Sequence, residues 1–412
     1  MTDTSSSKRA AGMGFIMVTV LIDMISIGLI VPVLPHIVGL FTQGNDEQTL
    51  GFLMLTLAFG VANFFGSPVL GALSDRFGRR PVLLIGFAGL ALSFFVTASA
   101  PALWVLVVVR LFSGAMQSNI AIANAYVADI TAPQDRAKRF GQLGAMFGLG
   151  FMLGPVIGGL LGDVDVRLPF YVAGCLAVVN WLYGFFVLPE SLPVERRRPL
   201  ELRKLNPVAA LQGLNRVNDI GPLVLVLALS ALAQFMLHTS WVLYTKFKFG
   251  WGPGQVGWSL LAVGVVSVIS QGVLLRPLLK RFSAQRLAIA GMGSGALAYL
   301  GFGLASEGWM MYVVIGANLL GGVAAAAMQS IISNATDATH QGQTMGAISS
   351  LNSLMAVCAP IVALELLRWV SHRPAGDLLI GLPFFTCAAL QALAMFITLR
   401  FFRRQAAAAQ PA

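Results

Sequence analysis

Charged residues are scarce in this chain. Asp, Glu, Lys and Arg make up 11% of its 412 residues, against about 25% in soluble domains, whereas hydrophobic residues make up 57%. This balance excludes an ordinary water-soluble globular protein. Cysteine is also rare, and Cys175, Cys358 and Cys387 lie in apolar runs without CxxC spacing. Neither a disulfide framework nor a zinc site is therefore indicated.

Motifs for nucleotide hydrolysis and hydrolytic catalysis are missing. The sequence has no GK[ST] loop, no HExxH and no G-x-S-x-G. We therefore expect no enzyme activity, no metal and no cofactor, and no direct use of ATP. The net charge of +10 would suit a nucleic-acid surface if the basic residues clustered on one folded face. They lie instead in short connectors between long apolar runs, so no nucleic-acid partner is expected.

Long apolar runs are what the chain does have. A bilayer core of about 30 Å needs roughly 20 apolar residues in a helix, and runs of this length recur between polar breaks. The first run is too long for the apolar core of a signal peptide and no cleavage site follows it, so an uncleaved helix is predicted. The twelve predicted spans are 13–36, 49–71, 81–99, 102–125, 140–162, 168–188, 220–245, 255–279, 285–304, 309–333, 343–366 and 378–402.

Basic residues predict the orientation of these spans. With the N-terminus inside, 21 of the 27 Lys and Arg residues fall in inner loops and tails, as expected for cytoplasmic connectors. An even number of spans then puts both termini in the cytoplasm. The predicted domains are a tail at 1–12, a six-helix bundle at 13–188, a linker at 189–219, a second six-helix bundle at 220–402 and a tail at 403–412.

The two halves also resemble each other. Six identities share an offset of 205 residues and fall on corresponding landmarks, among them Trp104 with Trp309 and Pro155 with Pro360. An even number of helices per repeat gives both halves the same orientation in the membrane. The sequence therefore predicts an all-α membrane protein of two parallel six-helix bundles.

The first inner loop carries the most specific local pattern, Gly71-Ala-Leu-Ser-Asp75-Arg76-Phe-Gly78-Arg79-Arg80. Its glycines would permit a tight turn, its arginines would anchor the cytoplasmic surface, and its aspartate would pair with arginine or cap a helix. A solvated turn with ordinary inner-side arginines is the alternative. That alternative leaves the glycine spacing unexplained.

This decapeptide resembles the signature of the major facilitator superfamily. The run from Leu21 to Pro35 is similar to the first helix of its drug:proton antiporters, closest to the tetracycline-exporter branch. The run from Gly148 to Gly159 resembles the fifth-helix motif of the antiporters, with Gly150, Gly154, Pro155 and Gly158 as its landmarks. The resemblance implies alternating access by two bundles. A bendable, closely packed fifth helix would suit gating, although Pro155 would also fit a packing kink.

Two charges lie deep within predicted spans, Asp23 in the first and Arg110 in the fourth. Each costs about 2.5–3.5 kcal/mol there on insertion scales, so each should face the interior and have a partner. One interpretation is a static ion pair. The other makes Asp23 the proton acceptor, with a change in its distance from Arg110 or in its hydration loading and releasing the proton.

Polar residues at mid-depth are the candidates for a substrate cavity. In the fourth span, Arg110, Gly114, Gln117, Ala121 and Asn124 would share one helical face. Interhelical hydrogen bonding is the alternative role for each of these side chains, and for His238 either helix packing or a second proton site. The candidate cavity residues are Ser26, Asn63, Gln117, Gln234, His238, Trp241, Gln271, Asn318 and Gln329.

Taken together, these features predict a proton-coupled exporter of an amphipathic small molecule, driven by the proton gradient. The alternatives are a proton-coupled importer or symporter of a metabolite and a non-transporting receptor. Tetracycline exporters also carry acids in their third and ninth helices, but 81–99 and 285–304 contain none, so the resemblance extends only to a drug or metabolite. We expect a monomer in the bacterial inner membrane, with small molecules, protons and lipid as its partners.

Overall fold

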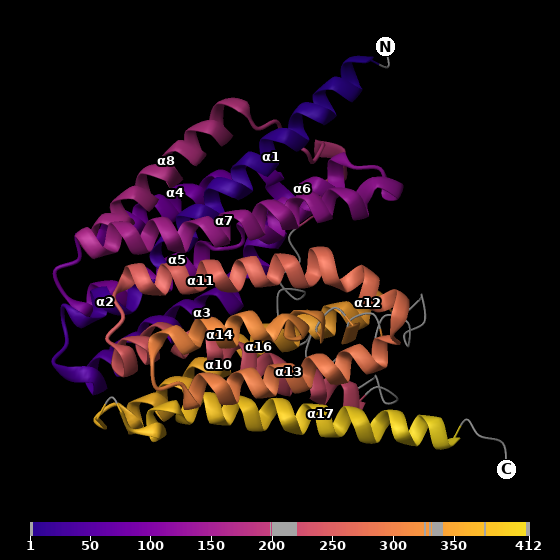
Figure 1. The fold of residues 1–412 in the computed structure, drawn as a ribbon. Coiled ribbons are helices and arrows are strands. Elements are labelled where there is room, and N and C mark those ends of the chain that lie inside the picture. The colour runs from indigo at the N-terminus through magenta and orange to yellow at the C-terminus, as the bar shows by residue number, and fades with distance from the viewer. Residues whose placement is uncertain are drawn as a thin grey trace. The chain divides into compact units, whose positions relative to one another are not determined.

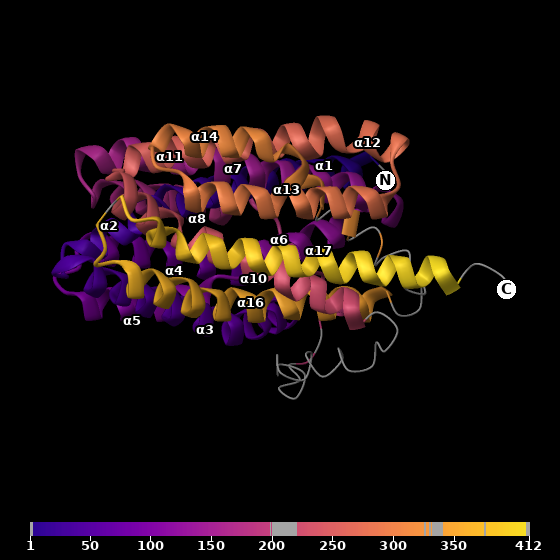
Figure 2. The same cartoon turned by 60° about the horizontal axis from the view of Figure 1, so that its bottom comes forward.

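The described part of the chain is helical throughout and contains no strand. The computed structural model describes residues 3–197, 199, 221–324, 327–328, 331, 341–374 and 376–408. Within these residues, eleven helical segments are long and apolar enough to cross a membrane, and Gly308–Ala324 is a shorter apolar one. The linker beyond 199, and the predicted cavity residue Gln329, lie outside the described residues. Figures 1 and 2 show the helices from two directions.

The chain forms two compact units. Unit 1 comprises 1–42, 54–207 and 252–261, and unit 2 comprises 43–53, 208–251 and 262–412. The segments 43–53 and 252–261 thus each pack with a unit that is formed mainly by the other half of the sequence.

Helices of the first half begin and end close to the predicted polar breaks. The first span continues past Ile30 through a short turn at residues 31–33, where Pro32 cannot donate a backbone hydrogen bond. The helices are α1 (Asp3–Ile30), α2 (Leu34–Gly39), α3 (Gly44–Phe77), α4 (Arg79–Ala98), α5 (Leu103–Met116), α6 (Asn119–Ile130), α7 (Arg136–Val164) and α8 (Leu168–Val187).

The second half shows the same alternation of long helices and short loops. Its eighth span contains a π-helical segment, Ile269–Leu274, between α11 and α12, and a 3-10 segment, Asn318–Leu320, follows α14. The helices are α10 (Gly221–Phe249), α11 (Pro253–Val268), α12 (Leu275–Arg281), α13 (Ala284–Leu304), α14 (Gly308–Ala317), α16 (Gln341–Val370) and α17 (Leu382–Ala408).

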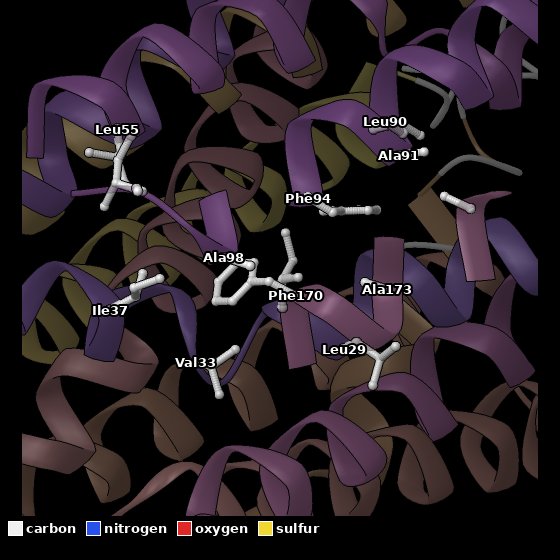
Figure 3. Packing of buried hydrophobic residues seen from close by; sticks show 14 of the residues in the cluster. Leu29, Val33, Ile37, Leu55, Leu90, Ala91, Phe94, Ala98, Phe170 and Ala173 are labelled. Atoms are coloured by element: carbon white, nitrogen blue, oxygen red, sulfur yellow. The ribbon is translucent and has the colours of Figure 1, made fainter. Parts of the chain in front are cut away.

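Apolar packing holds the helices of each unit together. In unit 1, α1 lies against α7 and α8, and α4 lies against α8 (Figure 1). Figure 3 shows one of its buried clusters, in which Phe94 from α4 and Phe170 from α8 meet Leu29 and Val33 from the first span. In unit 2, α10 packs against α16 and α17, and α13 packs against α17. These contacts fix the helices that carry the polar residues described next.

Candidate functional site

The fourth span is interrupted at mid-depth. Helix α5 ends at Met116 and α6 begins at Asn119, because Gln117 (φ −90°, ψ 85°) and Ser118 (φ −131°, ψ 15°) leave the helical conformation. The span predicted over 102–125 is confirmed as one apolar segment, Leu103–Ile130, but the prediction of a single helical face from Arg110 to Asn124 is wrong because the break changes the register.

A break in a membrane helix leaves carbonyl groups that need donors. Asn63 of α3 supplies them, since its Nδ2 atom donates to the carbonyl oxygens of Gly114 (3.3 Å) and Gln117 (2.6 Å). Gly66 brings the two helices close enough, because a Cβ atom at that position would lie 2.6 Å from the Ala115 carbonyl oxygen. Asn63 is thus positioned to stabilise the break.

A cavity of about 290 Å³ adjoins the break. Asp23 of α1 lines it and is only 4% exposed, with the Asn119 side chain donating a 3.2 Å hydrogen bond from Nδ2 to its Oδ1 atom. The Ser118 hydroxyl is buried without a hydrogen-bond partner. The lining residues are Asp23, Ser67, Gln117, Ser118, Asn119, Ile120, Ala121 and Asn124. Asn119 was not predicted as a site residue. Its polar side chain in the middle of an apolar span was the available signal.

Asp23 and Arg110, both among the described residues, do not form an ion pair. The Arg110 guanidinium instead lies over the ring of Phe59 in α3, with 5.8 Å between Cζ and the ring centroid. Asn119 takes the position of partner to the carboxyl group. The interpretation as a static Asp23–Arg110 pair is therefore not supported by this structure.

The loop motif forms a network around Arg79. Its guanidinium contacts Asp75 at 2.5 Å and Asp129 of α6 at 3.0 Å, and donates to the Ser74 hydroxyl at 2.7 Å. Gly78 has a φ of 109°, a conformation that glycine adopts without strain. The motif therefore joins α3, α4 and the end of the fourth span through one arginine that is 9% exposed.

A second acidic residue outside the motif holds the start of α4. Glu190 accepts hydrogen bonds from the backbone N–H groups of Arg79 (2.9 Å) and Arg80 (3.2 Å), where a carboxylate favours the positive end of a helix. Glu190 and Asp129 were not predicted as site residues. Both are acidic residues just beyond the predicted cytoplasmic ends of spans, and this position was the signal that could have marked them.

The remaining motif residues have simpler surroundings. Arg76 lies over the ring of Phe77, and Arg80 donates to the Phe185 carbonyl. A Cβ atom at Gly71 would meet open space, so close packing does not explain that glycine.

The fifth-helix glycines pack α7 against α1. A Cβ atom at Gly150 would lie 2.6 Å from the Met24 side chain, and one at Gly154 would lie 2.7 Å from the Gly28 Cα atom. Gly158 similarly approaches the Leu29 backbone. The face that carries these three glycines therefore contacts the first span. Pro155 lies within α7 and presents its carbonyl oxygen to Gly257 at the start of α11, within unit 1.

In unit 2, three of the candidate polar residues lie in two small networks. The Tyr299 hydroxyl donates to Gln234 Oε1 at 3.1 Å, and Gln234 Nε2 lies 3.0 Å from His238 Nε2. Ser294 donates to Asn318 Oδ1 at 3.0 Å, where α14 gives way to the 3-10 segment. Tyr299 was not predicted, because a tyrosine within an apolar helix usually packs against its neighbours.

The other candidates are engaged more locally. The Trp241 ring is buried against Phe302 and Phe384. Ser26 donates to the Ile22 carbonyl of its own helix, and Gln271 donates to Ser267. Among the residues that the structure describes, no three His, Cys, Asp or Glu side chains gather into a metal site.

The fold and the buried polar sites are those of a multi-pass membrane transporter. A model of the major facilitator superfamily matches residues 16–360 and, a second time, residues 223–411. The chain belongs to this superfamily, and its relatives place it in the tetracycline-exporter branch.

Two bacterial relatives and one solved structure illustrate the likeness. The class C tetracycline resistance protein of Escherichia coli is 36% identical over 84% of this chain and 86% of that protein. The class B protein of Escherichia coli is 32% identical over 93% of this chain and 95% of that protein. The crystal structure of the human organic anion transporter MFSD10 covers 95% of this chain and 99% of its own, with a TM-score of 0.69 at 22% identity. That last likeness concerns the fold alone.

Proposed function

We propose that this protein is a proton-coupled exporter of amphipathic small molecules, drugs or metabolites, in which Asp23 accepts the proton. The observation that carries the proposal is the buried Asp23 carboxyl group, which borders a cavity at the broken fourth span and has an amide rather than a cation as its partner. Intramembrane carboxylates with such surroundings are characteristic of proton pathways. The tetracycline resistance relatives support export as the direction of transport.

Proton loading follows from the surroundings of Asp23. Burial disfavours the ionised carboxylate, whereas the Asn119 amide favours it, so small changes in hydration shift the balance between the two states. Arg110 lies two helical turns before the break at Gln117. Movement at the break would change its distance from Asp23, and this gives Arg110 a role in releasing the proton.

The proposed substrate class is broader than tetracycline. The relatives are named for tetracycline resistance, yet α4 and α13 of this chain contain no Asp or Glu. With fewer acidic side chains within its spans, the protein has less capacity to bind a substrate that carries a metal ion. The Gln234, His238 and Tyr299 network offers hydrogen bonds beside an otherwise apolar helix surface, which suits an amphipathic molecule with few polar groups.

The proposed topology has twelve spans in two parallel six-helix bundles. Both termini lie in the cytoplasm and the protein is a monomer in the bacterial inner membrane, with the proton gradient as its energy source. Eleven long apolar segments and the shorter Gly308–Ala324 support the count, and the distribution of basic residues supports the orientation.

Transport by the Asp23→Asn variant tests the proposal. A drug-susceptibility panel in a bacterium without its own exporters first identifies a transported compound. Everted vesicles with an imposed pH gradient then report whether that compound stimulates proton release. We expect Asp23→Asn to abolish this coupling while the protein remains folded in the membrane.

The matched control is Asp135→Asn, the same change at an exposed carboxylate outside the spans, which should behave as the wild type. Proton-coupled transport by Asp23→Asn would refute the assignment of Asp23. Movement of the compound in the same direction as the proton would instead indicate a symporter.

A further inference from the structure

Asn119 makes an asymmetric set of contacts at the start of α6. Its Nδ2 atom donates to Asp23 Oδ1, whereas its own Oδ1 atom is buried and has no hydrogen-bond partner. The residue is 4% exposed, so water does not readily reach that oxygen. An unsatisfied buried carbonyl is unfavourable, which suggests that the side chain also serves a second arrangement.

The chemistry of the two side chains defines that arrangement. An ionised carboxylate only accepts hydrogen bonds, so the NH2 group of the amide must face it. A protonated carboxyl group gains an O–H donor, and the amide oxygen then becomes the better partner. A half-turn of the Asn119 amide therefore satisfies Asp23 in either protonation state.

We propose that Asn119 is a positioning residue that reverses its amide when Asp23 binds a proton, and so transmits proton binding to the break in the fourth span. This inference rests on the proposed role of Asp23. Proton binding at Asp23 would reach the break through Asn119 because Asn119 is the first residue of α6. It adjoins the two residues that leave the helical conformation.

Gly86 of α4 provides the space for this reversal. A Cβ atom at Gly86 would overlap the Asn119 Oδ1 atom and would lie 3.5 Å from the Met116 carbonyl oxygen. After the half-turn, the amide NH2 group would therefore point toward the side of the Met116 carbonyl group, which is the last carbonyl of α5. The reversed amide would keep its hydrogen bond to Asp23 of α1 and would add a link between α5 and α6 across the break.

Charged side chains on the helices around Asp23 have other partners. On α5, Arg110 lies over Phe59, and on α6, Asp129 is paired with Arg79. On α7, Asp163 accepts from the Gly254 backbone. Of the other ionisable side chains on the elements packed against α1, Cys175 is exposed on α8, and the rest lie toward helix ends or have other partners: Tyr126, Arg136, Lys138, Arg139, Tyr171 and Tyr183.

Infrared titration of the purified protein in lipid tests the inference without a transported substrate. The protonated Asp23 carboxyl group gives a C=O band that is absent from Asp23→Asn, and its pH midpoint and frequency are both measured. In Asn119→Leu, the carboxylate loses a charge-assisted hydrogen bond, so protonation persists to higher pH. We expect the midpoint to rise by about one pH unit and the band frequency to change.

Three further variants sharpen the result. Gly86→Ala should raise the midpoint in the same direction, because it displaces the amide without touching Asp23. Asn119→Thr keeps a rotatable hydroxyl group that can donate or accept, so it should shift the midpoint less than Asn119→Leu and carries the test if that variant does not fold. Gln142→Leu replaces an amide by leucine on α7, at a residue that is not part of the cavity wall, and should leave the midpoint in place.

The outcomes separate the two proposals. A wild-type midpoint and band frequency in Gly86→Ala and in the folded Asn119 variants would overturn the role of Asn119. Persistence of the band in Asp23→Asn would instead show that Asp23 is not the titrating group, and the proposed function would fail first.

Discussion

Arg79 shows how one residue can hold several elements together. It is nearly buried, and it binds Asp75 and Ser74 from α3 and Asp129 from α6. The neighbouring Arg76, by contrast, is exposed and lies over the adjacent Phe77 ring. Arg79 and Arg76 of the loop motif therefore contribute unequally to the stability of the folded protein.

Replacing Arg79 should destabilise the protein more than replacing Arg76. Arg79→Gln leaves two carboxylates without their cation, and hydrogen bonds to charged groups contribute about 1.5–3 kcal/mol each. We expect a clearly lower apparent unfolding temperature in detergent for Arg79→Gln. Arg76→Gln, an exposed change worth about 0.5 kcal/mol or less, serves as the control. Equal unfolding temperatures for both variants would contradict the network.

At the scale of elements, the α1–α7 contact depends on glycine. Backbone meets backbone at Gly154 and Gly28, so a larger side chain has no room between the helices. Gly154→Val should cost about 1–3 kcal/mol or more through overpacking. Gly148→Val makes the same change on the same helix, where a Cβ atom would meet open space.

Thermal unfolding of the two purified variants measures this difference. We expect Gly154→Val to unfold at a lower temperature than the wild type, or to be lost from the membrane, and Gly148→Val to remain close to the wild type. If Gly154→Val proved as stable as Gly148→Val, the close approach of α1 and α7 would not be needed for the folded state.

At the scale of the whole molecule, the proposed topology places the two ends of α13 on opposite sides of the membrane. Gln285 lies at its start and Ser306 just beyond its end, and both are exposed. In a version without the native cysteines, a membrane-impermeant maleimide should label Ser306→Cys in intact cells. It should label Gln285→Cys only after the membrane is opened. The reverse pattern would invert the topology.

Sequence patterns predicted much of this fold because their physical causes are local. A span needs about 20 apolar residues in a row, and this signal can be read without knowing any neighbour. Gly78 is similar, since a φ of 109° is a property of one residue. The burial of Asp23 also followed from its depth within an apolar run.

The partners of these residues were decided only by tertiary structure. Asp23 meets Asn119 96 positions away, and Arg79 meets Asp129 50 positions away, contacts that no local pattern encodes. The break in the fourth span depends on Asn63 of another helix, which provides the donor that the freed carbonyls need inside a membrane. The sequence by itself therefore determined where apolar helices form and which charges lie within them. Tertiary structure decided where one helix is interrupted and which side chain holds the buried carboxyl group, because both depend on hydrogen bonds between helices.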